Sequence, residues 1–382
     1  MIWCACHFGS STYAVTRTRW LVAADDRTGA FDAAGELASG LGPVAIRCMD
    51  TDAPDLADLD GVVVDLGTRH MPPERAAAIA GAVPFADRTW SAHKIDSQLR
   101  GNWATELVAR HRTTGVRVLV VPAWPELHRV CVDGVVCVNG TPVADGPAGH
   151  DPRSPVRSSR PAEHLRSAGA TDVTAVCATD DLDAWLAGTS PFAVCDAATG
   201  ADIDTIARWW AAHTASVLLA APGGPIGAAA RAMGDGYQIE QPQPPVFGHH
   251  WLIVCGSLHP MARRQIHALT RRYPHVMVVA TDQVEQKAVV GHDDANQAAR
   301  DLAVRAADRT AGSMVSTMLI IGGDTAAAVI GDKPWTVWGH AGPGLPYGRA
   351  TDGTGPWVIT KAGGFGDDQT LVDLYSTFGG HS

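Results

Sequence analysis

The sequence contains very little lysine, and it has no long apolar run. Only four lysines occur among 382 residues, the arginines are scattered, and the formal net charge is −10. Without a basic stripe or tail, the chain lacks the electrostatic signature of a nucleic-acid-binding protein, so we expect no nucleic-acid partner. No stretch of about eighteen apolar residues is present, and the opening segment lacks the pattern of a secretory signal. These absences predict a cytoplasmic protein that has no membrane partner.

Two further motif classes are missing. The eight cysteines are spread along the chain without a CxxC or Cys/His spacing, which predicts buried free thiols rather than a zinc site. The histidines also lack metal-ligand spacing. No GxxxxGK[ST] phosphate-binding loop occurs either, so any nucleotide must be bound by other turns.

The composition is that of a globular enzyme, with 46% hydrophobic residues, 18% charged residues and 40 glycines. Short apolar runs alternate with alanine-rich stretches of helical period, which predicts an α/β fold with largely parallel sheets. The length favours two domains, and a proline-rich connector over 234–248 marks their boundary. We therefore expect a poorly defined extension over 1–18, a first domain over 19–240 and a second over 241–382, with a cleft between the domains.

Two segments of the first domain combine charged residues with a predicted strand end. In LVAADDRTGA, Asp25 and Asp26 follow a strand and precede a helix, so they are placed to contact substrate hydroxyls, although an aspartate there also suits a helix N-cap. In HKIDSQLRGN, Lys94 and Arg100 flank Asp96. Two cations around a carboxylate suit a small anion, and a surface ion-pair cluster is the alternative.

Three turns of the second domain are rich in glycine. GSLHP, GGDT and KAGGFG each follow a predicted strand. Helix starts in such turns expose backbone amides that favour phosphate oxygens. Each turn alone is also compatible with a plain loop, as is the proline-rich excursion that starts at PAWPELHR. Together with the charged segments of the first domain, however, the turns predict a cleft enzyme with two substrates.

Read in order, seven segments resemble the four-carbon acid-sugar kinases, a family long catalogued as DUF1537. The resemblance covers the chain from about Trp20 to Leu374. The segments are ADDRTGA (24–30), KIDSQLRGN (94–102), PAWPELHR (122–129), DPRSPV (151–156), GSLHPMARRQ (256–265), GGDT (322–325) and KAGGFG (361–366).

The resemblance implies an acid-binding N-terminal domain, an ATP-binding C-terminal domain, and phosphorylation of a hydroxyl of threonate, erythronate or a 3-oxo-tetronate-like acid. ATP and Mg²⁺ are the expected cofactors. In this hypothesis two cations clamp the substrate carboxylate and one aspartate deprotonates the hydroxyl. The expected catalytic residues are Asp26 and Asp96. The expected acid-binding residues are Asp25, Arg27, Arg69, Lys94, Gln98 and Arg100, of which Lys94 and Arg100 form the clamp. The expected nucleotide-binding residues are Ser257, Gly322, Gly323, Asp324, Lys361, Gly363, Gly364 and Phe365, and Asp324 is also the expected metal ligand.

The sequence also departs from the family pattern. Arg27 stands where a leucine is expected, Gln98 and Ala262 where threonines are expected, and Leu258 and His259 where a small uncharged pair is expected. Because two of these changes flank the expected acid site, the sequence leaves open whether the acceptor is an altered hydroxy-acid. Two alternatives remain: an ATP-dependent enzyme that activates a different acid or an amino acid, and a ligand-binding regulator without catalysis. The sequence also leaves open whether two copies form a homodimer.

Overall fold

A computed structural model describes residues 19–49, 60–85, 90–151, 153–177, 179–233, 244–281, 292–312 and 314–379. The extension expected over 1–18 lies outside these residues, as does the part of the expected connector over 234–243.

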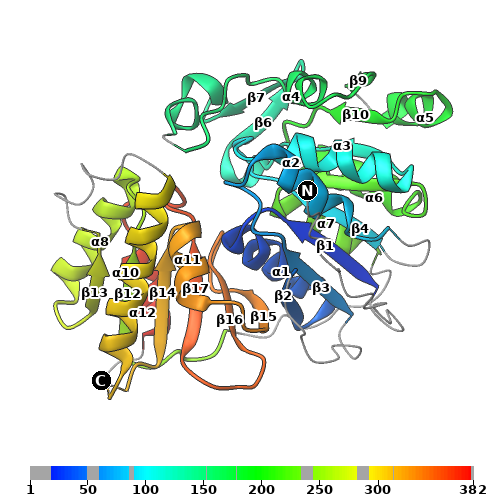
Figure 1. Ribbon diagram of the computed structural model, residues 1–382. Helices are drawn as coiled ribbons and strands as arrows, with labels where there is room; N and C mark the ends of the chain where they lie inside the picture. The colour runs from blue at the N-terminus through cyan, green and yellow to red at the C-terminus, as the bar shows by residue number, and fades with distance from the viewer. Residues whose placement is uncertain are drawn as a thin grey trace, which may run out of the picture.

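The N-terminal half is built on eight parallel strands in the order β2-β3-β1-β4-β11-β5-β10-β9 (Figure 1). Strands β1 and β11 are apolar along their whole length, as expected for strands covered on both faces, whereas β4 between them carries the buried polar side chains of Ser91, His93 and Lys94. The strands are β1 (Trp20–Ala24), β2 (Val44–Cys48), β3 (Gly61–Asp65), β4 (Trp90–Lys94), β5 (Arg117–Val120), β9 (Val173–Val176), β10 (Phe192–Cys195) and β11 (Val217–Ala221).

Helices α1, α6 and α7 pack in series on one another, whereas α2 packs against α3. Local signals set several of the helix ends. Asp26 caps α1, Gly115 ends α3 in the left-handed conformation, and Thr199 and Asp202 form a capping box on α6. The helices are α1 (Arg27–Leu41), α2 (Pro73–Gly81), α3 (Trp103–Thr114), α4 (Pro161–Ser167), α5 (Thr179–Ala187), α6 (Gly200–Ala211) and α7 (Gly223–Met233).

A three-stranded antiparallel sheet branches off after β5. Its strands β6 and β7 meet at a turn in which Asp133 and Gly134 both have positive φ, the conformation that a two-residue hairpin turn requires and that an Asp-Gly dipeptide favours. Short 3₁₀ turns surround this sheet. The elements are η1 (Pro125–Leu127), β6 (Arg129–Val132), β7 (Val135–Val138), β8 (Thr141–Pro142), η2 (Val143–Asp145) and η3 (Pro147–His150).

The C-terminal half continues the main sheet with strands in the order β13-β12-β14-β17-β16-β15, of which β15 and β16 run antiparallel to their neighbours. Helix α10 packs on α11, and α8 packs on α12. The elements are β12 (Trp251–Cys255), α8 (Pro260–Arg272), β13 (Met277–Ala280), α10 (His292–Thr310), β14 (Thr317–Ile321), α11 (Gly323–Ile330), β15 (Trp335–His340), β16 (Pro346–Ala350), β17 (Trp357–Lys361) and α12 (Thr370–Phe378).

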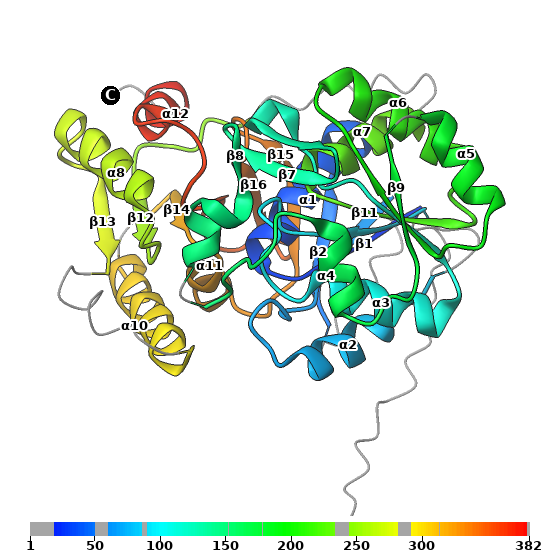
Figure 2. The same ribbon diagram turned by 90° about the horizontal axis from the view of Figure 1, so that it is seen from above.

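The two halves are joined by an antiparallel pairing of β15 with β2, in which Trp335 lies opposite Ile46 and Val337 opposite Val44. Helix α1 packs against β15, β16 and α11 at this junction, as Figures 1 and 2 show from two directions. The α/β class and the largely parallel strand arrangement are therefore confirmed, but the two halves share one 14-stranded sheet instead of having one sheet each. The division into domains over 19–240 and 241–382 stays a prediction.

Among the described residues, two large hydrophobic clusters support this sheet, beside a small one formed by Ala23, Leu66, Ala80 and Val83. The larger surrounds β1, β4, β5 and α1 and reaches into the C-terminal half through Ile320, Ala326 and Val337. The smaller is aromatic and lies between the sheet and helices α8 and α12. None of the described helices combines the length and the apolar character needed to cross a lipid bilayer.

Candidate active site

A cavity of about 590 Å³ lies where the two halves meet. Its walls include the segments that follow the carboxyl ends of β1, β3, β4, β12, β14 and β17. Ligands of open α/β sheets bind at this edge, and the volume is in the usual range for a small-molecule site.

Arg69 holds the two adjacent aspartates that follow β1. Its Nε and Nη2 donate to the two carboxylate oxygens of Asp25 at 2.8 Å each, and its Nη1 donates to Asp26 Oδ2 at 2.6 Å. Asp25 has no exposed surface, whereas Asp26 and Arg69 line the cavity. Asp25 therefore orients Arg69 from behind, and Asp26 is the member of the pair that a ligand can reach.

The two aspartates differ in acidity. Burial raises the pKa of Asp25 to about 7 in spite of the Arg69 guanidinium. Burial also acts on Asp26, but the charges of Arg69 and Lys94 and two hydrogen bonds outweigh it and lower its pKa. Asp26 is thus ionised at neutral pH and available as a hydrogen-bond acceptor.

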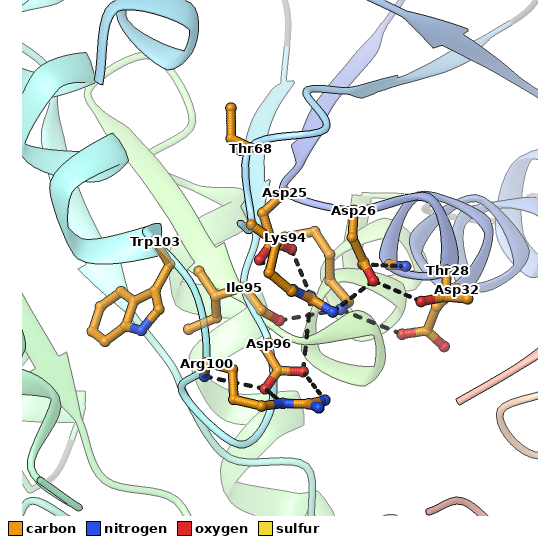
Figure 3. Close-up of polar contacts among 12 residues, drawn as sticks. Asp25, Asp26, Thr28, Asp32, Thr68, Lys94, Ile95, Asp96, Arg100 and Trp103 are labelled. Carbon is orange, nitrogen blue, oxygen red and sulfur yellow. Dashed lines mark hydrogen bonds and ion pairs between the residues drawn. The ribbon is translucent and has the colours of Figure 1, made fainter. Parts of the chain in front are cut away.

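Asp26 is also the N-cap of α1. Its Oδ1 accepts from the Gly29 amide at 2.7 Å, and its Oδ2 accepts from the Thr28 hydroxyl at 2.8 Å (Figure 3). The N-cap interpretation of this aspartate is therefore confirmed. The same carboxylate also lines the cavity, and its contact with substrate hydroxyls stays a prediction.

The turn after β4 places a second acidic group beside the first. Asp96 accepts from Arg100 Nε at 2.9 Å and from Arg100 Nη2 at 3.1 Å, and it also accepts from the backbone amides of Gln98 and Arg100 (Figure 3). Burial opposes ionisation of Asp96, but Arg100 and Arg69 lower its pKa strongly. Arg100 in addition reaches Asp151 at 3.3 Å.

Lys94, the last residue of β4, points between these groups (Figure 3). Its Nζ lies 3.7 Å from Asp32 Oδ2 and donates to the carbonyl of Ile95 at 3.1 Å. Lys94, Asp96, Gln98 and Arg100 all line the cavity, as expected for the acid-binding segment.

Arg27 does not line the cavity. It is the first residue of α1, and its buried side chain turns toward the ends of β2 and β3, where Nε donates to Asp65 at 2.5 Å. Its Nη1 donates to the carbonyl of Gly331, just after α11. Arg27 therefore links the two halves. Because its side chain does not line the cavity, the arginine at this position, where a leucine is expected, does not indicate which acid binds.

The C-terminal half presents its three glycine turns to the same cavity. Ser257, Gly322, Gly323, Gly363, Gly364 and Phe365 all line it. A Cβ at position 363 would overlap the Ser257 hydroxyl, so the backbone of the turn after β17 packs directly against the Ser257 side chain in the turn after β12. Gly322 caps α11 without a side-chain hydrogen bond, and the amides of a first helical turn have no partner inside the helix. This edge offers amide donors suited to phosphate oxygens.

Lys361 lies behind that edge and does not line the cavity. Its ammonium group donates to the carbonyl of Ala362 at 3.0 Å and to that of Gly363 at 3.5 Å. Burial lowers its pKa to about 8. The structure therefore places Lys361 as a support of the glycine turn.

Asp324, the expected metal ligand, is the most exposed carboxylate of the site, with 42% of its side chain accessible. It forms an ion pair with Arg153, and it lies 3.7 Å from His70 Nε2. Burial lowers the pKa of His70 to about 4, so this histidine is neutral at pH 7. Within the described ranges, no group of three or more His, Cys, Asp or Glu side chains is arranged to hold a metal ion.

Sequence reasoning missed several lining residues. Arg129 and Arg153 stand in segments interpreted only as loops, and Asp32 lies inside an alanine-rich helix. The sequence did contain a signal for Asp32. This carboxylate lies four residues after Thr28 on a buried helix, so the two side chains lie on the same face of that helix. The two arginines had none beyond the family motifs at whose segments they stand.

The chain is similar to several known proteins. A family model described as a sugar-binding N-terminal domain matches residues 20–229. A D-threonate kinase of Cupriavidus necator is 29% identical, with 92% of this chain and 96% of the relative covered. A D-threonate kinase of Salmonella typhimurium is 24% identical over 93% and 97%, and a D-erythronate kinase of Heliobacterium modesticaldum is 28% identical over 66% and 60%.

Two solved structures share the fold. A Salmonella typhimurium protein described as a putative tRNA synthase superposes with a TM-score of 0.75 at 18% identity, covering 94% of this chain and 99% of the other. A Haemophilus influenzae protein assigned to the DUF1537 family superposes with a TM-score of 0.67 at 17% identity, covering 94% and 100%. At these identities the likeness is one of fold.

Proposed function

Because this chain belongs to the four-carbon acid-sugar kinase family, through the sugar-binding N-terminal domain over residues 20–229, we propose that it transfers a phosphoryl group from ATP to a hydroxyl of a short hydroxy-carboxylate. Acids of the threonate, erythronate or 3-oxo-tetronate type are the proposed acceptors. Relatives that are named as kinases of D-threonate and D-erythronate support this choice.

One observation carries the proposal. The carboxylate of Asp26 in the N-terminal half adjoins the backbone of Gly323 in the C-terminal half, where α11 begins. A hydroxyl held by Asp26 would therefore lie next to the place where α11 offers amides to phosphate. Phosphoryl transfer depends more on placing the acceptor hydroxyl next to the phosphate donor than on covalent catalysis by the protein.

On the nucleotide side, the glycine turns and the Ser257 hydroxyl fit a polyphosphate because they combine amide donors with backbone that carries no Cβ. Gly322, Gly323, Gly363 and Gly364 would follow the phosphates. Mg²⁺, when bound, would neutralise charge on the phosphate oxygens, and Asp324 is the cavity-lining carboxylate that would hold it. A site with one carboxylate suits Mg²⁺, which keeps several waters and binds through the substrate's phosphates.

On the acid side, Asp26 would accept the hydrogen bond of the attacking hydroxyl and take its proton as the new O–P bond forms and the bond to the ADP leaving group breaks. Asp96 would orient the acid through Arg100. Gln98 replaces an expected threonine and lines the cavity. Of the two departures beside the expected acid site, it is therefore the one that bears on acceptor choice.

The decisive experiment measures nucleotide binding and turnover separately in Asp26→Asn and Arg100→Ala. Both variants should bind ATP as the wild type does and lose turnover with four-carbon acids, Asp26→Asn by about 100-fold or more. Asp352→Asn, at an exposed turn outside the cavity, serves as a matched control.

Phosphorus NMR of the product separates the rivals. A phosphate ester supports the proposal, an acyl phosphate would indicate acid activation, and the absence of ADP formation with every acid tested would favour a ligand-binding regulator. Loss of ATP binding in both variants would overturn the assignment of acid and nucleotide to separate halves.

A further inference from the structure

The cations that line the cavity differ in whether a carboxylate already neutralises them. Arg69 pairs with Asp25 and Asp26, and Lys94 lies beside Asp32. The remaining pairs are Arg100 with Asp96 and Asp151, and Arg153 with Asp324. A substrate carboxylate that bound to any of these four would have to compete with an aspartate that is already in place.

Arg129 is the exception among the cavity-lining cations that the structure describes. It forms no ion pair with a described carboxylate, and its Nε has no hydrogen-bond partner there. Its Nη1 donates to the hydroxyl of Ser97, and its Cζ lies 4.6 Å from the ring centroid of Phe365. Only 4% of the residue is exposed.

The backbone holds Arg129 rigidly in this position. It is the first residue of β6, and its amide and carbonyl both bond to Trp124, which brackets the tight turn over η1. Ser97, which its side chain contacts, directly follows Asp96. Arg129 therefore lies beside the acid-binding turn, on the N-terminal side of the cavity.

Arg129 feels the charges of Asp96 and Asp32 but forms an ion pair with neither, and a buried cation without an ion pair is costly for the folded protein. Burial lowers the pKa of Arg129 to about 10, so the guanidinium is still charged at neutral pH. A bound anion would relieve this cost, and a carboxylate matches the planar fork of a guanidinium in two parallel hydrogen bonds. The Phe365 ring would shield such a pair from water.

We infer that Arg129 binds the carboxylate of the hydroxy-acid substrate. This inference rests on the proposed function and refines it, because the sequence had pointed to Lys94 and Arg100 for this role. In the refined picture Lys94 and Arg100 fix the aspartates that contact the acceptor hydroxyls, and Arg129 selects acids over neutral polyols.

The test compares Arg129→Met and Arg129→Lys with the wild type on two acceptors: a four-carbon hydroxy-acid, and the four-carbon polyol that has an alcohol in place of the carboxylate. Arg129→Met should raise KM for the acid roughly 10- to 100-fold, the loss expected for a hydrogen-bonded charge pair. KM for ATP and the slow turnover of the polyol should stay near their wild-type values. Arg129→Lys should keep part of the preference for the acid.

Arg110→Met is the matched control. Arg110 is fully buried in the same half, its Nε also lacks a partner among the described residues, and burial lowers its pKa to about 10, but it does not line the cavity. Its replacement should leave the ratio of acid to polyol turnover unchanged. Thermal unfolding of all three variants checks that they fold, and if Arg129→Met fails to fold, Arg129→Lys and the control decide the question.

Two failures can be told apart. If the wild type phosphorylates the acid and both Arg129 variants discriminate acid from polyol as it does, or if the variants raise KM for ATP instead, the inference is overturned while the kinase proposal stands. If the wild type forms no ADP with any acid but calorimetry shows acid binding that Arg129→Met abolishes, the inference holds and the kinase proposal fails.

Discussion

The carboxylate of Asp26 lies against the backbone of Gly323, so closely that a Cβ added to this glycine would stand 2.6 Å from Asp26 Oδ2. The same Cβ would lie 3.3 Å from the Thr28 hydroxyl. The two residues are almost 300 positions apart and belong to opposite halves of the molecule. Their contact places an ionised carboxylate at the positive end of α11, where the helix dipole favours it.

Gly323→Ala should therefore reduce catalysis without unfolding the protein. The added methyl group must push α11 away from α1, because its nearest neighbour is held by Arg69 and by the α1 cap. We expect turnover of the acid to fall roughly 100-fold, as for other displacements of about an ångström in an active site. Steady-state kinetics and thermal unfolding of the variant measure the two effects separately.

Gly40→Ala is the control for this substitution. A Cβ at Gly40 in α1 would meet its neighbours only at 3.8 Å and beyond, which is ordinary contact. Alanine should raise helix stability slightly there and leave turnover unchanged. Equal kinetics for the Gly323→Ala variant and the wild type would show that the contact between the halves has no part in catalysis.

Arg69→Met should destabilise the fold strongly. The substitution leaves Asp25 and Asp26 without the guanidinium that neutralises both, and Asp25 has no exposure to water. Removing one partner of a buried ion pair typically costs about 3–5 kcal/mol. Urea unfolding at pH 7 gives the difference in free energy.

Arg264→Met provides the comparison, because its pair with Asp368 is more than half exposed on both sides. Such pairs contribute about 0–1 kcal/mol. A loss of similar size in both variants would mean that Arg69 does not offset the free-energy cost of burying the two carboxylates.

Local patterns in the sequence predicted most elements and the positions of the strand ends. The hairpin at Asp133 and Gly134, the helix that starts after Asp26 and the charged turn after β4 all follow from residue type and spacing. Because parallel strands end at one edge, even the gathering of distant motifs there was predictable.

What the patterns could not carry was long-range geometry. No local periodicity specifies that β2 pairs with β15, so the sequence led us to expect two sheets where the structure has one. Neither could the sequence tell that Arg27 leaves α1 toward Asp65, or that Arg153 reaches Asp324 across 171 positions. Such contacts depend on how the assembled elements pack, and residue type alone does not determine them.

Asp324→Asn should raise the Mg²⁺ concentration needed for half-maximal turnover, by roughly tenfold. Asp324 is the cavity's most exposed carboxylate, and Arg153 now occupies one of its oxygens, so a cation and this arginine compete for the same group. Neutralising it removes a charged oxygen ligand of the kind that Mg²⁺ prefers.

Titration of activity with Mg²⁺ at saturating ATP makes this measurement. Asp332→Asn is the control, since that aspartate is 82% exposed and does not line the cavity. An unchanged Mg²⁺ requirement in Asp324→Asn would remove the proposed metal role of this residue.

Lys361→Met should change how stability depends on pH. The side chain is 1% exposed, and burial lowers its pKa from 10.5 to about 8. Below pH 8 the folded protein therefore holds a charged lysine at an energetic disadvantage, and between pH 8 and 10.5 the unfolded chain binds the extra proton. Wild-type stability should accordingly rise relative to the variant over this window, by about 3 kcal/mol in all.

The hydrogen bonds from Lys361 to the carbonyls of Ala362 and Gly363 add an offset that varies much less with pH. Denaturant unfolding of both proteins from pH 7 to 10 measures the difference, and a constant difference across that range would mean that Lys361 keeps an ordinary pKa in the folded state.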